Sequence, residues 1–187
     1  MRIISGIFKG KKILEPKDNN TRPLKDLTKE SIFNIIKHSN KFNIKLSDSC
    51  ILDLFSGVGS FGLECLSLGV KKVVFVENYD KVLAILKQNL SNLKSSKNYE
   101  IIEKDIYNDL TLIKLNQKFD IIFLDPPYKD KNINIILENI INFKILNKHG
   151  IIIIHRHKKE KNVFTHNIKI IEEKLYGISK IIFVSLN

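Results

Sequence analysis

The sequence predicts an α/β fold of the doubly wound class, in which helices cover both faces of a mostly parallel sheet. Between about residues 50 and 155, apolar runs rich in β-branched residues alternate with stretches of helical periodicity. These apolar runs are continuous, which is typical of strands that are buried on both faces. With 187 residues, the chain has the size of one domain and can bury a full core.

The predicted strands are short, and the clearest helix between them is amphipathic. That helix spans Asp80–Leu93, where valine and leucine recur at three- and four-residue spacing. We expect strands at Ile51–Leu54, Lys72–Val76, Glu100–Glu103, Phe119–Leu124 and Gly150–His155.

The two ends of the chain differ from this pattern. We expect a small basic β-hairpin of two short strands within residues 2–14, a helix over 25–38, and an antiparallel hairpin formed by 167–175 and 179–186. The sequence therefore predicts an N-terminal appendage over residues 1–24 and a main domain over residues 25–187.

The composition favours a cytoplasmic protein with an anionic partner. No apolar run approaches the roughly 18 residues that span a bilayer, and the first residues lack the apolar stretch of a signal peptide. Two cysteines are too few for a disulfide scaffold. The net charge of +11 suggests nucleic acid, although nearly all of it is lysine and compositional drift would give the same excess.

A glycine loop follows the first strand of the main domain. Gly57, Gly59 and Gly62 have the spacing of a dinucleotide-binding loop, and Glu77 ends the next strand, where an acid can hold ribose hydroxyls. Both NAD and S-adenosyl-L-methionine (SAM) are compatible with this pattern.

Asp53, at the end of that first strand, favours SAM. A carboxylate there would oppose the pyrophosphate of NAD, whereas the sulfonium and α-amino groups of SAM are cationic. The SAM carboxylate can use free N–H groups at the start of the following helix. An NAD-dependent oxidoreductase remains the alternative.

Asp105, after the third strand, has two interpretations. Its carboxylate can accept a hydrogen bond from the adenine amino group, with Ile106 against the ring. It can equally be the N-cap of a helix, because aspartate is a preferred capping residue.

The tetrapeptide Asp125-Pro126-Pro127-Tyr128 follows a buried strand at the sheet edge where ligands bind in such folds. The prolines remove two backbone donors and stiffen the chain, so acceptors dominate. The Asp125 carboxylate and the Pro126 carbonyl can each accept one N–H of an aromatic amino group and stabilise the charge that grows on its nitrogen during methylation. Tyr128 offers a face for stacking the base.

A simpler interpretation is a proline-rich turn that ends a strand, with Tyr128 in the core. The glycine loop two strands earlier favours the catalytic interpretation. No cysteine lies near the tetrapeptide, which disfavours methylation of a pyrimidine carbon through a thiolate adduct.

Two sequence signatures near the N-terminus narrow the choice of methyltransferase family. One is the run from Arg2 to Gly6 followed by Lys9-Gly10-Lys11-Lys12, and the other is Thr21-Arg22-Pro23 followed by residues 29–34, KESIFN. Together with the motifs above, they resemble the RsmD family over almost the whole chain. Members of that family are bacterial enzymes that methylate the N2 amino group of one guanine in small-subunit ribosomal RNA (rRNA). The Asp-Pro-Pro-Tyr motif alone is shared with adenine-N6 DNA methyltransferases.

The resemblance implies a Rossmann-like class I SAM methyltransferase fold, with a seven-stranded sheet that ends in the antiparallel hairpin. It implies 16S rRNA as partner, free or within the small subunit, and SAM as cofactor. We also expect a monomer and no metal. The resemblance assigns catalysis to Asp125, Pro126, Pro127 and Tyr128. It assigns SAM binding to Asp53, Phe55, Ser56, Gly57, Gly59, Glu77 and Asn78, with Asp105 and Ile106 at the adenine. RNA phosphates would be held by Lys9, Lys11, Lys12 and Arg22.

Two histidines lie outside these motifs. His155 and His157, two apart on a strand, would point the same way, as metal ligands can. The spacing suggests no third ligand, so we expect a solvated basic rim. Besides the RsmD activity, three alternatives remain: a DNA adenine methyltransferase, an NAD-dependent oxidoreductase and a noncatalytic ribosome-assembly factor.

Overall fold

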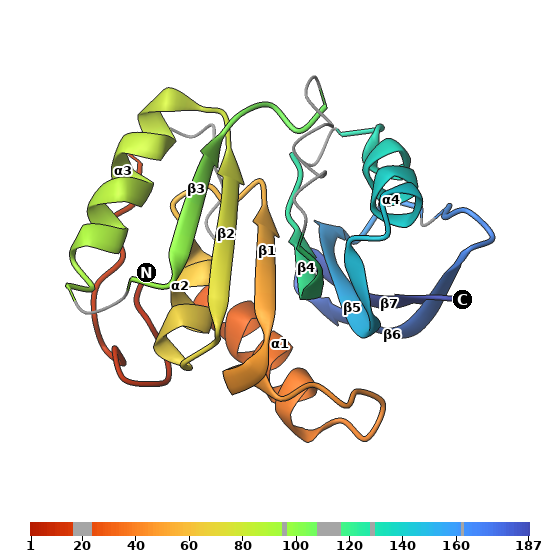
Figure 1. The fold of residues 1–187 in the computed structure, drawn as a ribbon, viewed down its shortest axis with the longest axis horizontal. Helices are drawn as coiled ribbons and strands as arrows, with labels where there is room; N and C mark the ends of the chain where they lie inside the picture. Colours follow the sequence, from red (N-terminus) through yellow and green to blue (C-terminus); the bar gives the residue numbers. More distant parts are fainter. Residues whose placement is uncertain (17–23, 95–96, 108–116, 128–129, 162) are drawn as a thin grey trace.

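The computed structural model describes residues 1–16, 24–94, 97–107, 117–127, 130–161 and 163–187. Its centre is a seven-stranded sheet with the order β3-β2-β1-β4-β5-β7-β6 (Figure 1). Strands β1 to β5 run parallel, and β7 is antiparallel to both β5 and β6. The strands are β1 (Cys50–Leu54), β2 (Lys72–Glu77), β3 (Tyr99–Glu103), β4 (Phe119–Leu124), β5 (Leu146–His157), β6 (Ile168–Tyr176) and β7 (Ser179–Leu186).

Helices cover both faces of the sheet, as the continuous apolar strands predict. Within each strand, alternate side chains enter two separate apolar clusters: Ile51 and Phe123 lie in one, Leu52 and Leu124 in the other. The first cluster packs against three helices and the second against one. The first group is α1 (Asp26–His38), α2 (Ser60–Ser67) and α3 (Asp80–Ser91), and the second is α4 (Ile133–Asn142). A short 3₁₀ helix, η1 (Leu46–Asp48), precedes β1.

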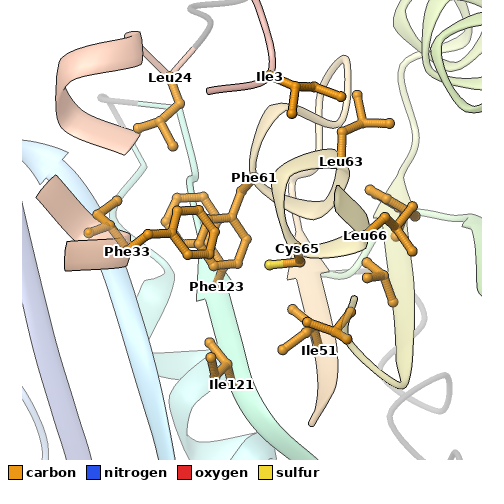
Figure 2. Close-up of a cluster of buried hydrophobic side chains, with 14 of the residues drawn as sticks. Ile3, Leu24, Phe33, Ile51, Phe61, Leu63, Cys65, Leu66, Ile121 and Phe123 are labelled. Carbon is orange, nitrogen blue, oxygen red and sulfur yellow. The ribbon is translucent and has the colours of Figure 1, made fainter. Parts of the chain in front are cut away.

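Three stacked phenylalanine rings join the helices to the strand that carries the predicted catalytic motif. Phe61 of α2 lies between Phe33 of α1 and Phe123 of β4, with centroid distances of 5.2 and 4.1 Å (Figure 2). The interplanar angles are 17° and 15°. Because all three rings are at most 2% exposed, the end of β4 is fixed by a rigid part of the core.

The bounds predicted from the sequence match the elements to within one or two residues, except in β5. This strand begins at Leu146 and ends at His157, beyond both predicted ends. Leu146 pairs with Phe119, and the register shifts before Ile121 pairs with Ile151. The polar residues before Gly150 therefore belong to a strand that the apolar pattern alone does not reveal.

The N-terminal segment does not form the two predicted strands. A single bridge, Arg2 with Lys12, replaces them, because the chain turns inward instead of extending a ladder. Ile3, Phe8 and Ile13 are 1, 7 and 1% exposed and share the first apolar cluster with α1 and α2. The first residues thus pack against the core that residues 25–187 form, and their separate role as an appendage stays a prediction.

A buried ion pair attaches this segment to the helices. Lys29 of α1 and Glu64 of α2 are both 0% exposed, with Nζ 3.1 Å from Oε2. Lys29 also donates to the Arg2 carbonyl at 2.8 Å, and Glu64 accepts the N–H groups of Ile4 and Ser5 at 3.0 and 2.7 Å. Each charge therefore has hydrogen-bond partners in the interior.

Candidate active site

The candidate site lies where the strand order reverses. β1 has β2 on one side and β4 on the other, so the loops after β1 and β4 leave the carboxyl edge of the sheet in opposite directions, which is where folds of this class bind ligands. The N–H of Asp125 lies 3.4 Å from the carbonyl of Leu54, the last residue of β1. The glycine loop and the tetrapeptide motif, about 70 residues apart in the chain, are therefore neighbours.

The glycine loop has the backbone that its sequence requires. Gly57 and Gly59 have φ of 56° and 86°, and Phe55 adopts φ of 59°, which is uncommon for a residue with a side chain. Gly62 lies in α2 so close to β2 that a Cβ would be 2.2 Å from Phe75 Cε1. The third glycine is thus needed for helix–sheet packing.

Glu77, at the end of β2, holds the glycine loop from the side. Its Oε2 accepts the N–H of Gly57 at 2.8 Å, and its Oε1 accepts the N–H groups of Asn78 and Tyr79 at 2.9 and 3.0 Å. Ser56 donates through Oγ to the Val76 carbonyl at 3.0 Å. A carboxylate has about four acceptor positions, so Glu77 retains capacity for a further donor such as a ribose hydroxyl.

Asp53 is the buried carboxyl of the site. It is 1% exposed, and its Oδ2 accepts the N–H of Gly62 at 3.0 Å. Its Oδ1 is buried with no hydrogen-bond partner in the described part of the chain. Burial, together with the negative charges of Asp125 and Glu77, raises the pKa of Asp53 well above its ordinary value. A buried, unpaired carboxyl oxygen of this kind suits a cationic ligand group.

Asp125 is fixed by a histidine that the sequence did not assign to the site. His155 Nδ1 lies 2.8 Å from Asp125 Oδ1, and His155 Nε2 lies 2.9 Å from the Oγ of Ser179. Burial opposes the charged imidazolium, but the Asp125 carboxylate outweighs this effect, so the pKa of His155 is raised. Among the described residues, no donor pairs with Asp125 Oδ2, and the Asp125 side chain is 19% exposed.

The predicted solvated rim of histidines is therefore wrong for His155, which is 5% exposed. The four isoleucines from Ile151 to Ile154 belong to a buried strand that continues into His155. This run is visible in the sequence and indicates that His155 is buried. His157 is half-buried at the end of β5, and its Nδ1 accepts the N–H of Lys159 at 3.2 Å.

A second cluster joins the loops after β3 and β4 to the end of β5. The Tyr107 hydroxyl donates to Asp130, and Arg156, 7% exposed, donates to the Asp130 carbonyl at 2.7 Å. Burial and the Asp130 carboxylate raise the pKa of Tyr107. The Phe55 ring lies 5.6 Å from the Tyr107 ring, so this cluster reaches the glycine loop.

The predicted adenine contacts lie beside that cluster. Asp105 Oδ1 accepts the N–H of Tyr107 at 2.9 Å, which is a turn contact two residues on. Ile106 is 3% exposed and belongs to the second apolar cluster. Both residues lie beyond the carboxyl end of β3, and their contacts with adenine stay a prediction.

The rest of the tetrapeptide is described in part. Pro126 is buried, and no described residue donates to its carbonyl, whereas the Pro127 carbonyl accepts the N–H of Asp130 at 2.8 Å. Tyr128, predicted to stack on the base, and Arg22, predicted to hold phosphate, lie outside the described residues.

The predicted phosphate-binding lysines lie away from Asp125. The loop that carries Lys9 contacts the last residue of α2, where the N–H of Ile7 donates to the Ser67 carbonyl at 2.8 Å. Lys11 Nζ donates to the carbonyl of Asn92, just after α3, at 3.1 Å. Helices α2 and α3 begin at the carboxyl edge of the sheet, so their ends lie toward its amino edge (Figure 1). Lys9, Lys11 and Lys12 are exposed on that side, and the structure does not bring them beside the catalytic motif.

Asn89 is a site-supporting residue that the sequence analysis missed. It is 3% exposed in α3 and donates to the Val58 carbonyl of the glycine loop at 3.0 Å. It also accepts the N–H of Leu14 at 2.8 Å. The Asn89 amide thus connects the glycine loop to the N-terminal segment. The sequence feature that could have identified it is a polar residue beside the leucines of a helix face.

Within the described residues, none of the helices is both long and apolar enough to cross a membrane.

Comparison with known proteins agrees with this geometry. The family model described as "Conserved hypothetical protein 95" matches residues 1–185. Ribosomal RNA small subunit methyltransferase D of Haemophilus influenzae is 32% identical over 183 residues, covering 95% of this chain and 90% of that protein. A Bacillus subtilis protein assigned as an rRNA methyltransferase is 32% identical over 181 residues, covering 96% of this chain and 95% of that protein.

Solved structures have the same fold. An Escherichia coli protein assigned as a methyltransferase, 22% identical, superposes with a TM-score of 0.81 over 98% of this chain and 96% of its own. A protein assigned as a methyltransferase and solved in complex with SAH, 14% identical, gives a TM-score of 0.65 over 84% of this chain and 49% of its own. The fold is therefore the Rossmann-like class I methyltransferase fold. The family match over nearly the whole length, with the motifs in their expected places, shows that this chain belongs to the RsmD family, the one whose model is called "Conserved hypothetical protein 95".

Proposed function

We propose that this protein transfers a methyl group from SAM to the exocyclic N2 amino group of a guanine in 16S rRNA. One observation carries the proposal. Two carboxyl groups, Asp53 and Asp125, lie at the switch point of the sheet, and each has an oxygen that no described residue pairs. One oxygen would face the cationic cofactor and the other the amino group of the substrate.

The residues present fit SAM. Asp53 would face its cationic sulfonium and amino groups, and the glycine loop (Phe55, Ser56, Gly57, Gly59) would hold its methionine end. Glu77 and Asn78 would face the ribose, and Asp105 and Ile106 the adenine. SAM supplies an electrophilic methyl group. Burial and the neighbouring carboxylates disfavour the anion of Asp53. A cationic cofactor would favour that anion, whereas the phosphates of NAD would add further negative charge beside it, so the site favours SAM.

The substrate amino group would be held by acceptors. Its nitrogen is a poor nucleophile because the lone pair is delocalised into the base. Asp125 Oδ2 and the Pro126 carbonyl can each accept one N–H, which turns the lone pair toward the methyl group. As positive charge grows on the nitrogen, the fixed Asp125 carboxylate stabilises it. Tyr128 is proposed to stack on the base.

The proposal that the substrate is rRNA rests on the related proteins. The Haemophilus influenzae relative is named for the small-subunit rRNA, and the one from Bacillus subtilis is assigned to rRNA. The net charge of +11 gives the surface an attraction for RNA phosphates, to which we assign Lys9, Lys11, Lys12 and Arg22.

The test offers the protein labelled SAM with four separate substrates: unmodified small ribosomal subunits, naked 16S rRNA, transfer RNA and duplex DNA. Label should enter the ribosomal RNA. Label that enters DNA alone would support the adenine methyltransferase instead, and binding of NAD without binding of SAM in calorimetry would support an oxidoreductase.

Asp125→Asn is the matched catalytic variant, because it keeps the shape and removes the charge. We expect methyl transfer to fall by about 10²–10³-fold, the usual effect of losing one preorganised electrostatic group. SAM affinity, measured by calorimetry, should stay within a few-fold of the unmodified protein. Turnover that is unchanged in Asp125→Asn would remove this carboxylate from the mechanism.

A further inference from the structure

We propose that His155, held in turn by Ser179, is a positioning residue that orients the Asp125 carboxylate and tunes its strength as an acceptor. The inference rests on the proposed function and deepens it. It assigns a role to a residue that the sequence motifs do not include.

The three side chains form a line across neighbouring strands. Asp125 follows β4, His155 lies in β5, and Ser179 begins β7, and these strands are adjacent in the sheet. The contacts are 2.8 Å from Asp125 Oδ1 to His155 Nδ1 and 2.9 Å from His155 Nε2 to Ser179 Oγ. Exposure falls along the line, from 19% for the Asp125 side chain to 6% for that of His155.

This arrangement fixes the imidazole. Both ring nitrogens have partners, so the ring cannot turn without breaking a buried hydrogen bond. With Oδ1 occupied by His155, Asp125 presents Oδ2 to the substrate. An acceptor that is already oriented does not have to be ordered when the amino group arrives.

The charged groups near the His155 ring determine how readily it is protonated. In the described part of the chain, Asp125 is the charged group that contacts the ring, and β7 contributes the uncharged Ser179. The neighbouring cations point elsewhere: Lys180 donates to the Glu160 carbonyl, and Arg156 to the Asp130 carbonyl.

The proton on His155 sets the charge of the acceptor. A neutral ring donates from Nδ1 to Asp125 and accepts at Nε2 from Ser179, which leaves Asp125 a full anion. An imidazolium would neutralise part of that charge and would also oppose the positive charge that grows on the amino nitrogen. In the transfer, the amino lone pair forms the new C–N bond, the C–S bonding pair returns to sulfur, and the surplus N–H proton leaves through Asp125 Oδ2 to solvent. A neutral His155 leaves Asp125 fully negative, which favours both the growth of positive charge on the nitrogen and the transfer of its proton to Asp125 Oδ2.

The test compares His155→Asn and His155→Leu with the unmodified protein. Asparagine keeps an N–H donor near the position of Nδ1 but does not titrate, whereas leucine removes the donor. His157→Gln is the matched control, because it changes a histidine in the same strand that is half-buried and lies outside the site. The readouts are kcat and KM for small subunits at saturating SAM, from about pH 5.5 to 9.

For the unmodified protein and His157→Gln, we expect kcat to fall as pH falls through the pKa of His155, which lies above the ordinary value of 6.5. His155→Asn should lose this acid limb and keep most of the kcat at high pH. His155→Leu should lose about 10-fold or more in kcat with little change in KM or SAM affinity. An acid limb that persists in His155→Asn, or a kcat unchanged in His155→Leu, would overturn the proposal.

A second readout does not depend on methyl transfer. In an NMR titration of the His155 ring, Asp125→Asn should lower the pKa of His155, because it removes the charge that raises it. A pKa that does not move would show that the two groups are not coupled, which also overturns the inference. By contrast, an unmodified protein that methylates none of the substrates while Asp125→Asn shifts the titration would refute the proposed function and leave the coupling intact.

Discussion

Asp53 shows how a single residue can serve binding at a cost in stability. The unfolded chain ionises this carboxyl above its ordinary pKa of 3.8, whereas the folded protein buries it with Oδ1 unpaired among the described residues. Its folded pKa is raised, so its contribution to stability is fully present below pH 3.8 and is lost as pH rises toward the folded pKa. At neutral pH, the ligand-free protein therefore carries a destabilising group.

Asp53→Asn should accordingly stabilise the ligand-free protein at neutral pH. We expect the free energy of unfolding to rise by about 1–2 kcal/mol at pH 7, with a gain that shrinks toward pH 4. Urea denaturation at several pH values measures this. The same variant should bind SAM at least about 10-fold more weakly, because a neutral amide does not attract a cation. Tighter SAM binding by Asp53→Asn would contradict the role given to this carboxyl.

The hydrogen-bond partners of His155 illustrate what the sequence could not reveal, although the isoleucine run before it indicates a buried strand. The basic run around it suggests a solvated strand end. Its partners Asp125 and Ser179 lie 30 and 24 residues away and meet it only in the folded sheet. The positions of Asp53, Gly57 and Glu77 at one edge of the sheet were predictable, because each lies at or just after the end of a strand that the sequence indicates.

Among the elements, α1 and α2 position the N-terminal segment through the buried pair of Lys29 and Glu64. Both side chains are 0% exposed, so loss of one leaves the other charge without compensation in the interior. The segment that depends on Glu64 also contacts α3 through Leu14 and Asn89, and Asn89 holds the glycine loop.

Lys29→Met should therefore lower the free energy of unfolding by about 3 kcal/mol. Lys37→Met, on the exposed side of the same helix, is the control and should change it by less than about 0.5 kcal/mol. Thermal and urea denaturation of the two variants give the comparison. Equal stability of the two would show that the pair contributes no more than a surface charge.

The elements themselves were largely predictable, for a physical reason. The parallel strands are runs such as Ile121–Leu124, which are buried on both faces and need no tertiary information to recognise. The two N-terminal strands were predicted but do not form, because Ile3 and Phe8 gain more from burial in the core than a two-stranded ladder would provide. The early part of β5 was missed because its polar residues lie between the paired residues Leu146 and Ile151, where the register shifts.

Over the whole molecule, the exposed N-terminal lysines and the catalytic motif lie toward opposite edges of the sheet. Only a large substrate can reach from the loop with Lys9 to Asp125, which suits an RNA and not a mononucleotide. The lysines would contribute electrostatic attraction to phosphates away from the reacting base.

The combined replacement of Lys9, Lys11 and Lys12 by Gln should raise KM for the RNA substrate and leave kcat and SAM affinity unchanged. The salt dependence of RNA binding should become shallower, by about 0.7–0.9 in slope for each phosphate that the variant no longer neutralises. Filter binding over a range of salt concentrations measures this slope. An unchanged slope would show that these lysines do not bind RNA phosphates.

Methylation of guanine N2 in small-subunit rRNA can be measured by mass spectrometry of its nucleosides after incubation with the protein and SAM. The proposed function predicts N2-methylguanosine as the new product, formed by the unmodified protein and, because Asp125 carries the proposed catalysis, not by Asp125→Asn. A methyl group found on adenine, on a ring carbon or on ribose, or formed equally by Asp125→Asn, would contradict the account.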